Sequence, residues 1–427
     1  MNNKKRPELL IPAGSLEVLK VAVDYGADAV YLGGQKYGLR AKAGNFTIEE
    51  MLDAADYVHA AGARLYVTVN IFAHNDDIEG VKQYFTELRS AGLQGKIDAF
   101  IISDPGLITL AKKMLPEIDL HISTQANNTN YLTYNFWHDF GATRVVAARE
   151  LSLKEIRGIR DNIPQDMEIE AFMHGAMCIS YSGRCLLSSY FTGRDANKGA
   201  CTHPCRWKYS LVEEKRPGEY LPVEEDERGT YIFNSKDLCM IEYIPEMIEA
   251  GIDSFKVEGR MKTALYVACV TRTYRQAIDD YLESEELYRS RMDYYREEIA
   301  ACTYRQFTTG FYFGKTDETS QIYDNNTYIK NYTYLGTIED ITDDGLYMIH
   351  QKNKFCVNDE VNIMSFDGRN IYARVEGIYD EKMIGMESAP HPKQQLYIKL
   401  VGISPEDDGS IKDIKPGMVM RSRHCEA

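Results

Sequence analysis

Four cysteines lie close together near the middle of the chain, in the spacing C-x6-C-x15-C-x3-C. They are Cys178, Cys185, Cys201 and Cys205, and they make up almost half of the nine cysteines in the sequence. Thiolates are ligands for zinc and for iron–sulfur clusters, and four of them are enough for either. The segment from Glu168 to Tyr209 therefore predicts a metal centre.

The spacing of these cysteines leaves the identity of the metal open. Zinc sites favour close pairs, and only Cys201 and Cys205 form one. The gaps match neither of the usual ferredoxin patterns. Zinc and an iron–sulfur cluster are therefore alternatives, and Cys239, in the run NSKDLC, is an alternative fourth ligand. A redox disulfide site is less favoured because the sequence has no C-x-x-C run.

Positive charge gathers on the same segment, although the chain as a whole has a formal net charge of -15. Between His174 and Lys208 the only acidic residue is Asp195. This excess suits an anionic substrate near the cysteines, and it equally suits neutralisation of the thiolates. The acidic balance of the whole chain argues against nonspecific nucleic-acid binding, and we expect no DNA partner. The predicted substrate-binding residues are Arg184, Arg194, Lys198, Arg206 and Lys208.

Short apolar runs alternate with helix-length amphipathic stretches from the N-terminus to Val257. Most of these runs are apolar throughout, as in a parallel sheet that is covered on both faces. Eight such strands with helices between them predict an α/β fold of the (β/α)8 type, a TIM-like barrel. A doubly wound open sheet is the alternative, but no G-x-G-x-x-G run follows the first strand. The expected strands are residues 8–11, 29–32, 64–69, 99–102, 120–123, 144–147, 168–173 and 254–257.

In a barrel of this type the working residues follow the carboxyl ends of the strands. The cysteine segment follows the seventh strand, so it belongs on that face. For His174 a buried structural role is the commoner alternative, and Lys256 and Glu258 could instead form an interior ion pair. Asn70 and Gln125 could hydrogen-bond a planar ligand or cap the barrel. The catalytic candidates are Gln125, His174, Lys256, Glu258 and Arg260.

The composition of the chain changes beyond residue 300. Residues 301–332 are rich in Thr, Tyr, Asn and Gly and are predicted to form a linker. Residues 333–427 contain short apolar runs around two D-G turns, which are typical of hairpins. We therefore predict a barrel domain over residues 1–300, with a cysteine-rich insertion at 174–240, and a small all-β barrel domain over residues 333–427.

The sequence also indicates the compartment. No stretch approaches the length of apolar residues that spans a membrane. The N-terminal run MNNKKRPELLIPAGS has a basic start but no apolar core or cleavage site, so we expect no secretory signal. We therefore expect a cytoplasmic protein with no membrane partner. In a reducing compartment, clustered cysteines act as ligands or catalysts more often than as disulfides.

Four runs of the sequence carry a resemblance to a known family. They are LLIPAGSLEVLKVAVDYGADAVYLGG near the N-terminus, STQANNTN at Ser123–Asn130, EAFMHGAMCISYSGRCLLSS at Glu170–Ser189 and FKVEGRMKTALYVA at Phe255–Ala268. Together they resemble peptidase family U32 over essentially the whole chain, including the C-terminal β-domain of its longer members. No H-E-x-x-H or G-x-S-x-G run supports the proteolysis in the family's name.

The resemblance implies hydroxylation that uses no O2. Members of the family form 5-hydroxyuridine at the wobble position of tRNA, with prephenate as the implied hydroxyl donor, or act on 23S rRNA cytidine or on ubiquinone precursors. The length and the FMHGAMC run are most similar to the tRNA branch. Members that act on ubiquinone precursors bind a [4Fe–4S] cluster through four cysteines. Cys178, Cys185 and Cys201 match the first three ligands, and Cys205 matches the fourth in members that end in C-x3-C.

The resemblance also sets the expected cofactors and partners. They are a [4Fe–4S] cluster with zinc as the alternative, prephenate as co-substrate, tRNA as substrate and, by analogy, a shorter member of the family as a second subunit. Two alternative functions are a collagenase-like U32 peptidase and a zinc-stapled binding module.

Overall fold

The chain folds into two compact units. The first comprises residues 1–19, 28–261 and 305–328, and the second comprises residues 20–27, 262–304 and 329–427. The computed structural model describes residues 5–38, 45–178, 180–182, 184–207, 234–315, 321–322, 329–403 and 410–423.

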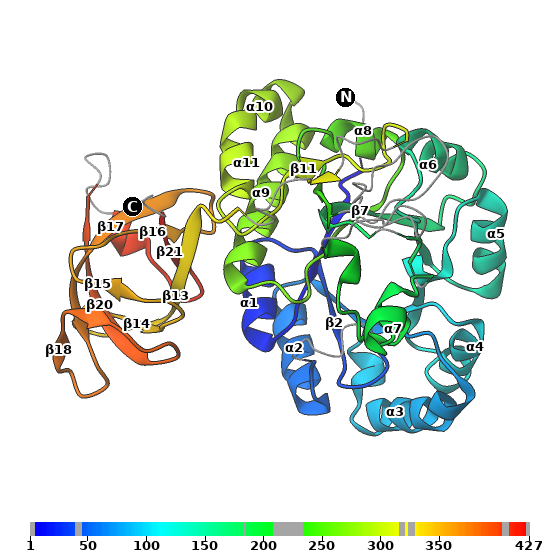
Figure 1. The fold of residues 1–427 in the computed structure, drawn as a ribbon, viewed down its shortest axis with the longest axis horizontal. Helices are drawn as coiled ribbons and strands as arrows, with labels where there is room; N and C mark the ends of the chain where they lie inside the picture. The colour runs from blue at the N-terminus through cyan, green and yellow to red at the C-terminus, as the bar shows by residue number, and fades with distance from the viewer. Residues whose placement is uncertain are drawn as a thin grey trace, which may run out of the picture. The chain divides into compact units, whose positions relative to one another are not determined.

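A closed barrel of eight parallel strands forms the centre of the first unit (Figure 1). Strands β1 to β7 pair in chain order, and β10 closes the ring by pairing with both β7 and β1. This closure confirms the predicted barrel and excludes the open sheet. The strands are β1 (Glu8–Pro12), β2 (Ala29–Gly33), β3 (Arg64–Val69), β4 (Ala99–Ile102), β5 (Asp119–Ile122), β6 (Arg144–Val146), β7 (Glu168–Ala176) and β10 (Ser254–Val257).

The barrel strands are apolar and buried along most of their length. The AVYLG run of β2 and the AFII run of β4 are buried throughout. Such strands need cover on their outer face, and amphipathic helices surround them (Figure 1). No helix within the described ranges is long and apolar enough to cross a membrane. The helices between the strands are α1 (Leu16–Asp24), α2 (Ile48–Ala60), α3 (Ile78–Ser90), α4 (Pro105–Met114), α5 (Tyr131–Phe140), α6 (Leu153–Arg160) and α8 (Ile244–Glu249).

The longest insertion of the first unit lies between β7 and β10. Strand β9 (Asp237–Cys239) pairs antiparallel with the end of β7. Strand β11 (Phe307–Thr308) then joins β9 in parallel, so the segment predicted as a linker adds a strand to the first unit. Helix α7 (Leu187–Thr192) and strand β8 (Asn234–Ser235) also lie in this insertion, and β8 pairs with β12 (Gln321–Ile322), which comes later in the chain.

Six antiparallel strands of the second unit close into a small barrel. Their pairing runs from β16 through β21, β13, β14, β20 and β17 back to β16. This confirms the predicted all-β barrel, and both D-G turns lie between paired strands as expected. The ring strands are β13 (Tyr332–Ile341), β14 (Tyr347–His350), β16 (Glu360–Met364), β17 (Asn370–Tyr379), β20 (Gln395–Gly402) and β21 (Val419–Arg423). The shorter strands are β15 (Phe355–Cys356), β18 (Gly385–Met386) and β19 (Ser388–Ala389).

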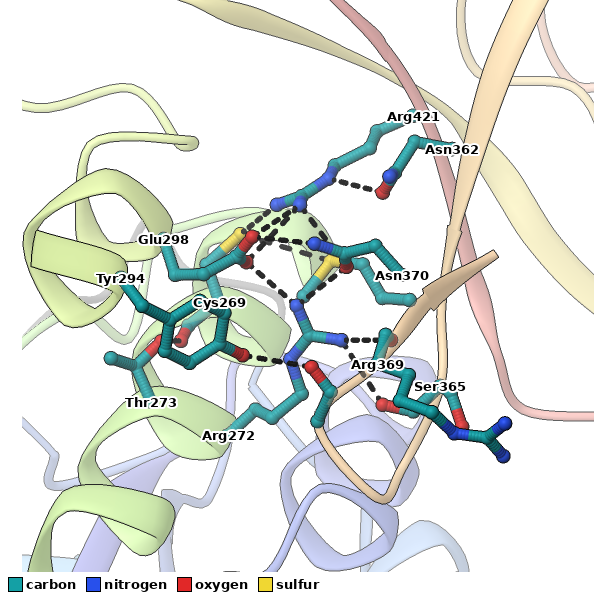
Figure 2. A network of polar contacts seen from close by, with 12 residues as sticks. Cys269, Arg272, Thr273, Tyr294, Glu298, Asn362, Ser365, Arg369, Asn370 and Arg421 are labelled. Atoms are coloured by element: carbon teal, nitrogen blue, oxygen red, sulfur yellow. Dashed lines mark hydrogen bonds and ion pairs between the residues drawn. The ribbon is translucent and has the colours of Figure 1, made fainter. Parts of the chain in front are cut away.

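Three helices belong to the second unit together with these strands. They are α9 (Ala264–Glu283), α10 (Glu285–Ser290) and α11 (Met292–Ile299). Arg272 of α9 and Arg421 of β21 both contact Glu298 of α11, at 2.6 Å and 2.9 Å, in a buried polar network (Figure 2). The unit therefore takes in residues 262–304, whereas the predicted domain boundary lies at residue 300.

Candidate active site and cysteine loop

One cavity in the first unit lies at the carboxyl ends of the barrel strands. It is lined by residues of β2, β3, β4, β7 and β10 and by the segments that follow β3, β5, β6, β7 and β10. Functional residues occupy this face in barrels of this type. The cavity brings together four of the five catalytic candidates and further polar residues. Its charged and amide-bearing side chains include Asn70, Gln125, Arg149, Lys256, Glu258 and Arg260.

All four clustered cysteines line this cavity, on the segment that we call the cysteine loop (the described residues between Met177 and Trp207). None of the four forms a disulfide within the described residues. Within the described parts of the chain, no three His, Cys, Asp or Glu side chains form a group that could hold a metal ion. The four thiols thus line one cavity, but they are not arranged to coordinate a single ion. Cys239, the alternative fourth ligand, is outside the cavity lining and lies on β9 opposite His174.

Two hydrogen bonds attach the cysteine loop to segments that follow barrel strands. Asn127, which follows β5, donates through Nδ2 to the carbonyl oxygen of Ser182 at 3.0 Å. The backbone N–H of Phe72, which follows β3, donates to the carbonyl oxygen of Asn197 at 3.1 Å. The loop is therefore fixed near the carboxyl ends of these strands, where its cysteines reach the cavity.

Arg149 lies in the cavity wall against Phe172. The guanidinium carbon is 3.9 Å from the centre of the Phe172 ring, and Nη1 donates to the carbonyl oxygen of Ala176 at 2.9 Å. Nη2 lies 3.7 Å from Oε2 of Glu258, while the buried Nε has no hydrogen-bond partner among the described residues. A bound anion could accept from this donor. Arg149 follows β6, at a strand end where site residues are expected, although it is not among the predicted catalytic candidates.

Lys256 enters the cavity from β10, where Glu170 of β7 neutralises it. The ammonium lies 2.6 Å from Oε1 of Glu170 and 4.5 Å from the centre of the Tyr31 ring. Glu170 is fully buried and also contacts Arg144 at 3.3 Å. Lys256 thus makes an interior ion pair with Glu170. The expected ion pair between Lys256 and Glu258 is wrong, because Glu258 lies beside Arg149.

Arg260 is held in the cavity wall by a hydroxyl group and by two glycines. Nη1 donates to Oγ1 of Thr68 at 2.7 Å, and the residue is nearly excluded from solvent. A Cβ atom at Gly33 would collide with this Nη1, and a Cβ atom at Gly14 would collide with the backbone carbonyl of Arg260. Both glycines therefore leave the space that Arg260 occupies.

His174 does not line the cavity. It is almost fully buried, and its ring centre lies 5.7 Å from that of Phe307. Phe172, two residues earlier on β7, does line the cavity. The register between β7 and β10 shifts after Phe172, because two residues of β7 oppose one residue of β10. Such a bulge changes the direction of the following side chain, which favours the structural role of His174.

Three of the predicted cations of the cysteine loop, Arg184, Arg194 and Lys198, have described side chains, and these are absent from the cavity lining. Arg184 and Lys198 are exposed and Arg194 is half-buried, and Lys198 pairs with Asp77 at 3.4 Å. The side chain of Arg206 and the whole of Lys208 lie outside the described residues. The positive charge on the cavity wall comes from Arg149, Lys256 and Arg260.

The cavity therefore combines three kinds of group. Its cations can bind carboxylate or phosphate groups, and its amides, including those of Asn70 and Gln125, can hydrogen-bond the edge of a planar base. Its thiols belong to a side-chain type that binds metals and iron–sulfur clusters. A substrate or pair of substrates with negative charge and a planar ring suits this arrangement.

Comparison with known proteins gives matches over both units. A family model described as "Peptidase family U32" matches residues 14–322, and one described as "Peptidase family U32 C-terminal domain" matches residues 330–418. The "tRNA hydroxylation protein P1" of Bacillus subtilis is 41% identical, over 93% of this chain and 92% of that protein. The "tRNA hydroxylation protein P" of Escherichia coli is 38% identical, over 90% and 92% respectively. The "23S rRNA 5-hydroxycytidine C2501 synthase" of E. coli is 37% identical, over 65% of this chain and 40% of that protein.

Proposed function

The chain belongs to peptidase family U32, and on that premise we propose that it hydroxylates tRNA without O2, forming 5-hydroxyuridine at the wobble position. The observation that carries the proposal is the cavity at the barrel mouth, which places cations, amides and four thiols together. Two relatives that match over nine tenths of the chain are named tRNA hydroxylation proteins, and a third is named for a hydroxycytidine of rRNA.

The donor set of the cysteine loop fits an iron–sulfur cluster in number and chemistry. None of the four cysteines forms a disulfide among the described residues, and the backbone N–H of His203 donates to Sγ of Cys201 at 3.4 Å. A cluster takes one thiolate on each iron, so its ligands need not meet at one point as the ligands of zinc must. When bound, a [4Fe–4S] cluster supplies one-electron transfer. The proposed ligands are Cys178, Cys185, Cys201 and Cys205.

The cavity residues would bind and orient two substrates. The wobble base leaves the anticodon stack to enter the cavity, as single-stranded bases do in sequence-specific RNA recognition. Asn70 and Gln125 would then hydrogen-bond its edge. Prephenate, the proposed hydroxyl donor, carries carboxylates that pair well with guanidinium groups such as those of Arg149 and Arg260.

The proposed reaction replaces C5–H of uridine by C5–OH. The ring carbon loses two electrons and gains the hydroxyl group. The donor carbon that gives up this hydroxyl gains the same two electrons and takes hydrogen in its place, so no O2 is consumed. The protein's part is to hold the two carbons close together and to keep bulk water from the cavity.

We expect tRNA from a strain that lacks this gene and any paralogue to contain no 5-hydroxyuridine derivatives at the wobble position. Plasmid-borne wild-type protein should restore them during anaerobic growth, as measured by mass spectrometry of tRNA nucleosides. Arg260→Ala should restore roughly a hundredth of the wild-type rate, because a hydrogen-bonded charge is lost from the cavity. Arg157→Ala, which breaks an exposed pair with Asp161 on α6, is the matched control. Normal tRNA in the deletion strain would contradict the proposal.

Anaerobic purification separates the alternative functions. The proposed enzyme should be brown, with about four irons per chain. A zinc-stapled module would be colourless with one zinc and would leave tRNA unchanged. A collagenase-like peptidase would still cleave peptides after loss of all four cysteines. The expected shorter family member as a subunit stays a prediction, which co-purification from the native host would test.

A methyl group at Gly33 should weaken the enzyme without unfolding it. Gly33→Ala places its Cβ against Nη1 of Arg260, which is the flexible end of that side chain and can move away. The hydrogen bond to Thr68 would then be lost, and kcat/KM for tRNA should fall roughly tenfold. Gly158→Ala on α6, where a Cβ meets nothing within 4 Å, is the matched control. Equal rates for the two variants would show that the position of Arg260 is unimportant.

A further inference from the structure

The cysteine loop exposes a group of large aromatic side chains, which we call the aromatic platform. Tyr190 is 83% exposed, Phe191 is 43% exposed and Trp207 is 46% exposed. The ring centres of Tyr190 and Phe191 are 5.1 Å apart, and those of Phe191 and Trp207 are 6.1 Å apart. Three large aromatic rings in contact with one another and with solvent form a continuous exposed patch, which is typical of a binding surface.

The platform belongs to the same loop that forms the cavity wall. Tyr190 and Phe191 lie on α7, which follows Cys185, and Trp207 follows Cys205 by two residues. Both cysteines line the cavity. The hydroxyl groups of Ser188 and Thr202 lie 3.0 Å apart and tie α7 to the second half of the loop. The platform and part of the cavity wall therefore belong to one hydrogen-bonded loop.

Charge indicates what kind of partner the platform takes. From Cys178 to Trp207 the sequence has four cations against Asp195 alone, on a chain with a net charge of -15. Arg184 and Lys198 are exposed on this loop. Exposed aromatic rings interleaved with cations suit single-stranded nucleic acid, because bases stack on the rings while phosphates pair with the cations. An apolar protein surface would offer no anionic groups to pair with these cations.

We propose that the aromatic platform stacks on the unpaired anticodon-loop bases next to the nucleotide that enters the cavity. This inference rests on the proposed function and assigns it a second subsite. Once the target base leaves the stack, its neighbours lose a stacking partner, and the platform replaces that partner. The cavity then selects the base to be modified, while the platform holds the open loop in any sequence context, since every base presents a flat face.

Fluorescence anisotropy with a synthetic anticodon stem-loop RNA and the full-length, anaerobically purified protein tests the proposal. Tyr190→Ala and Trp207→Ala should each bind roughly tenfold more weakly than wild type, as expected for loss of one stacked base. Tyr190→Phe, which keeps the ring, should bind like wild type. Phe136→Ala, which removes an exposed ring on α5, is the matched control and should have no effect.

The salt dependence separates stacking from charge. Tyr190→Ala should leave the slope of log K against log salt unchanged, whereas Arg184→Ala should reduce it by about 0.7. In turnover assays, Tyr190→Ala should raise KM for tRNA and leave kcat unchanged. Equal affinity of wild type and Tyr190→Ala for the RNA would overturn the proposal. So would a change in oligomeric state alone, which would indicate a protein interface.

RNA binding by the wild-type protein shows whether an error lies in the proposed function or only in the role of the aromatic platform. If the protein does not act on tRNA, the wild-type chain itself will not bind the stem-loop specifically. If only the platform is misassigned, the wild type binds and modifies the RNA, and the three aromatic residues can be replaced without loss of affinity.

Discussion

Replacing Cys205 by serine is expected to remove most of the iron from the purified protein and to reduce tRNA hydroxylation to background. The sequence leaves two alternatives for the fourth ligand, Cys205 and Cys239. The structure places Cys205 on the cavity wall with the other three clustered cysteines, and Cys239 on β9 outside that wall. A cluster that loses one of four thiolates is expected to be labile, because a serine hydroxyl is a harder and weaker ligand for iron.

Iron content and visible absorbance should be measured on anaerobically purified Cys205→Ser and Cys239→Ser, beside the tRNA assay. These readouts do not depend on activity. Cys239→Ser should keep about four irons per chain and near-normal hydroxylation. Circular dichroism should be the same for both variants, since Cys205 is only half-buried. The reverse result, with iron lost from Cys239→Ser and retained in Cys205→Ser, would move the fourth ligand to β9.

The barrel could be predicted because its signals are local. Each strand is a short apolar run between helix-length stretches. A parallel strand covered on both faces is apolar throughout, so it can be recognised without knowing which strands lie beside it. The same logic predicts the location of the cavity, because residues after the strands must meet at one end of the barrel. Asn70, Gln125 and the four cysteines follow from strand position alone.

The charges of the site depend on which signal is used. Strand position predicts Lys256, Glu258 and Arg260, whereas closeness to the cysteines in sequence selects cations that do not line the cavity. Arg184 and Lys198 are close to the cysteines in sequence, but their side chains lie on the exposed side of the loop. Arg149 and Arg260 are far from the cysteines in sequence, and the barrel brings them together. Distance along the chain is a poor guide to distance in a closed barrel, where every strand end reaches the same opening.

Replacing Glu298 by glutamine is expected to destabilise the second unit by about 3–5 kcal/mol. Glu298 lies between Arg272 and Arg421, and all three side chains are nearly excluded from solvent (Figure 2). Asn370 completes the network by donating to Oε1 of Glu298 at 2.7 Å and accepting from Arg272 at 2.8 Å. Glutamine keeps the shape but removes the charge, so two buried cations lose their shared carboxylate.

The melting temperature of the full-length protein should fall on the order of 10 °C in this variant. Glu360→Gln is the matched control, because Glu360 pairs with Arg374 at 3.5 Å on the surface of the same unit, where both side chains are more than half exposed. An exposed pair of this kind contributes less than about 1 kcal/mol. Equal melting temperatures for the two variants would show that the network does not stabilise the fold.

The pH dependence of the unfolding free energy should show whether the charge of Glu298 is the source of this stability. Burial alone would raise the pKa of Glu298, but the positive charges of Arg421 and Arg272 outweigh it, and the pKa lies below its ordinary value of 4.5. A carboxyl group with a lower pKa in the folded state stabilises the fold above its unfolded pKa and loses this effect as the pH falls through the folded value. The difference in unfolding free energy between wild type and Glu298→Gln should therefore be constant near neutral pH and shrink below pH 4.5. A difference that persists unchanged to about pH 3 would instead assign the effect to packing.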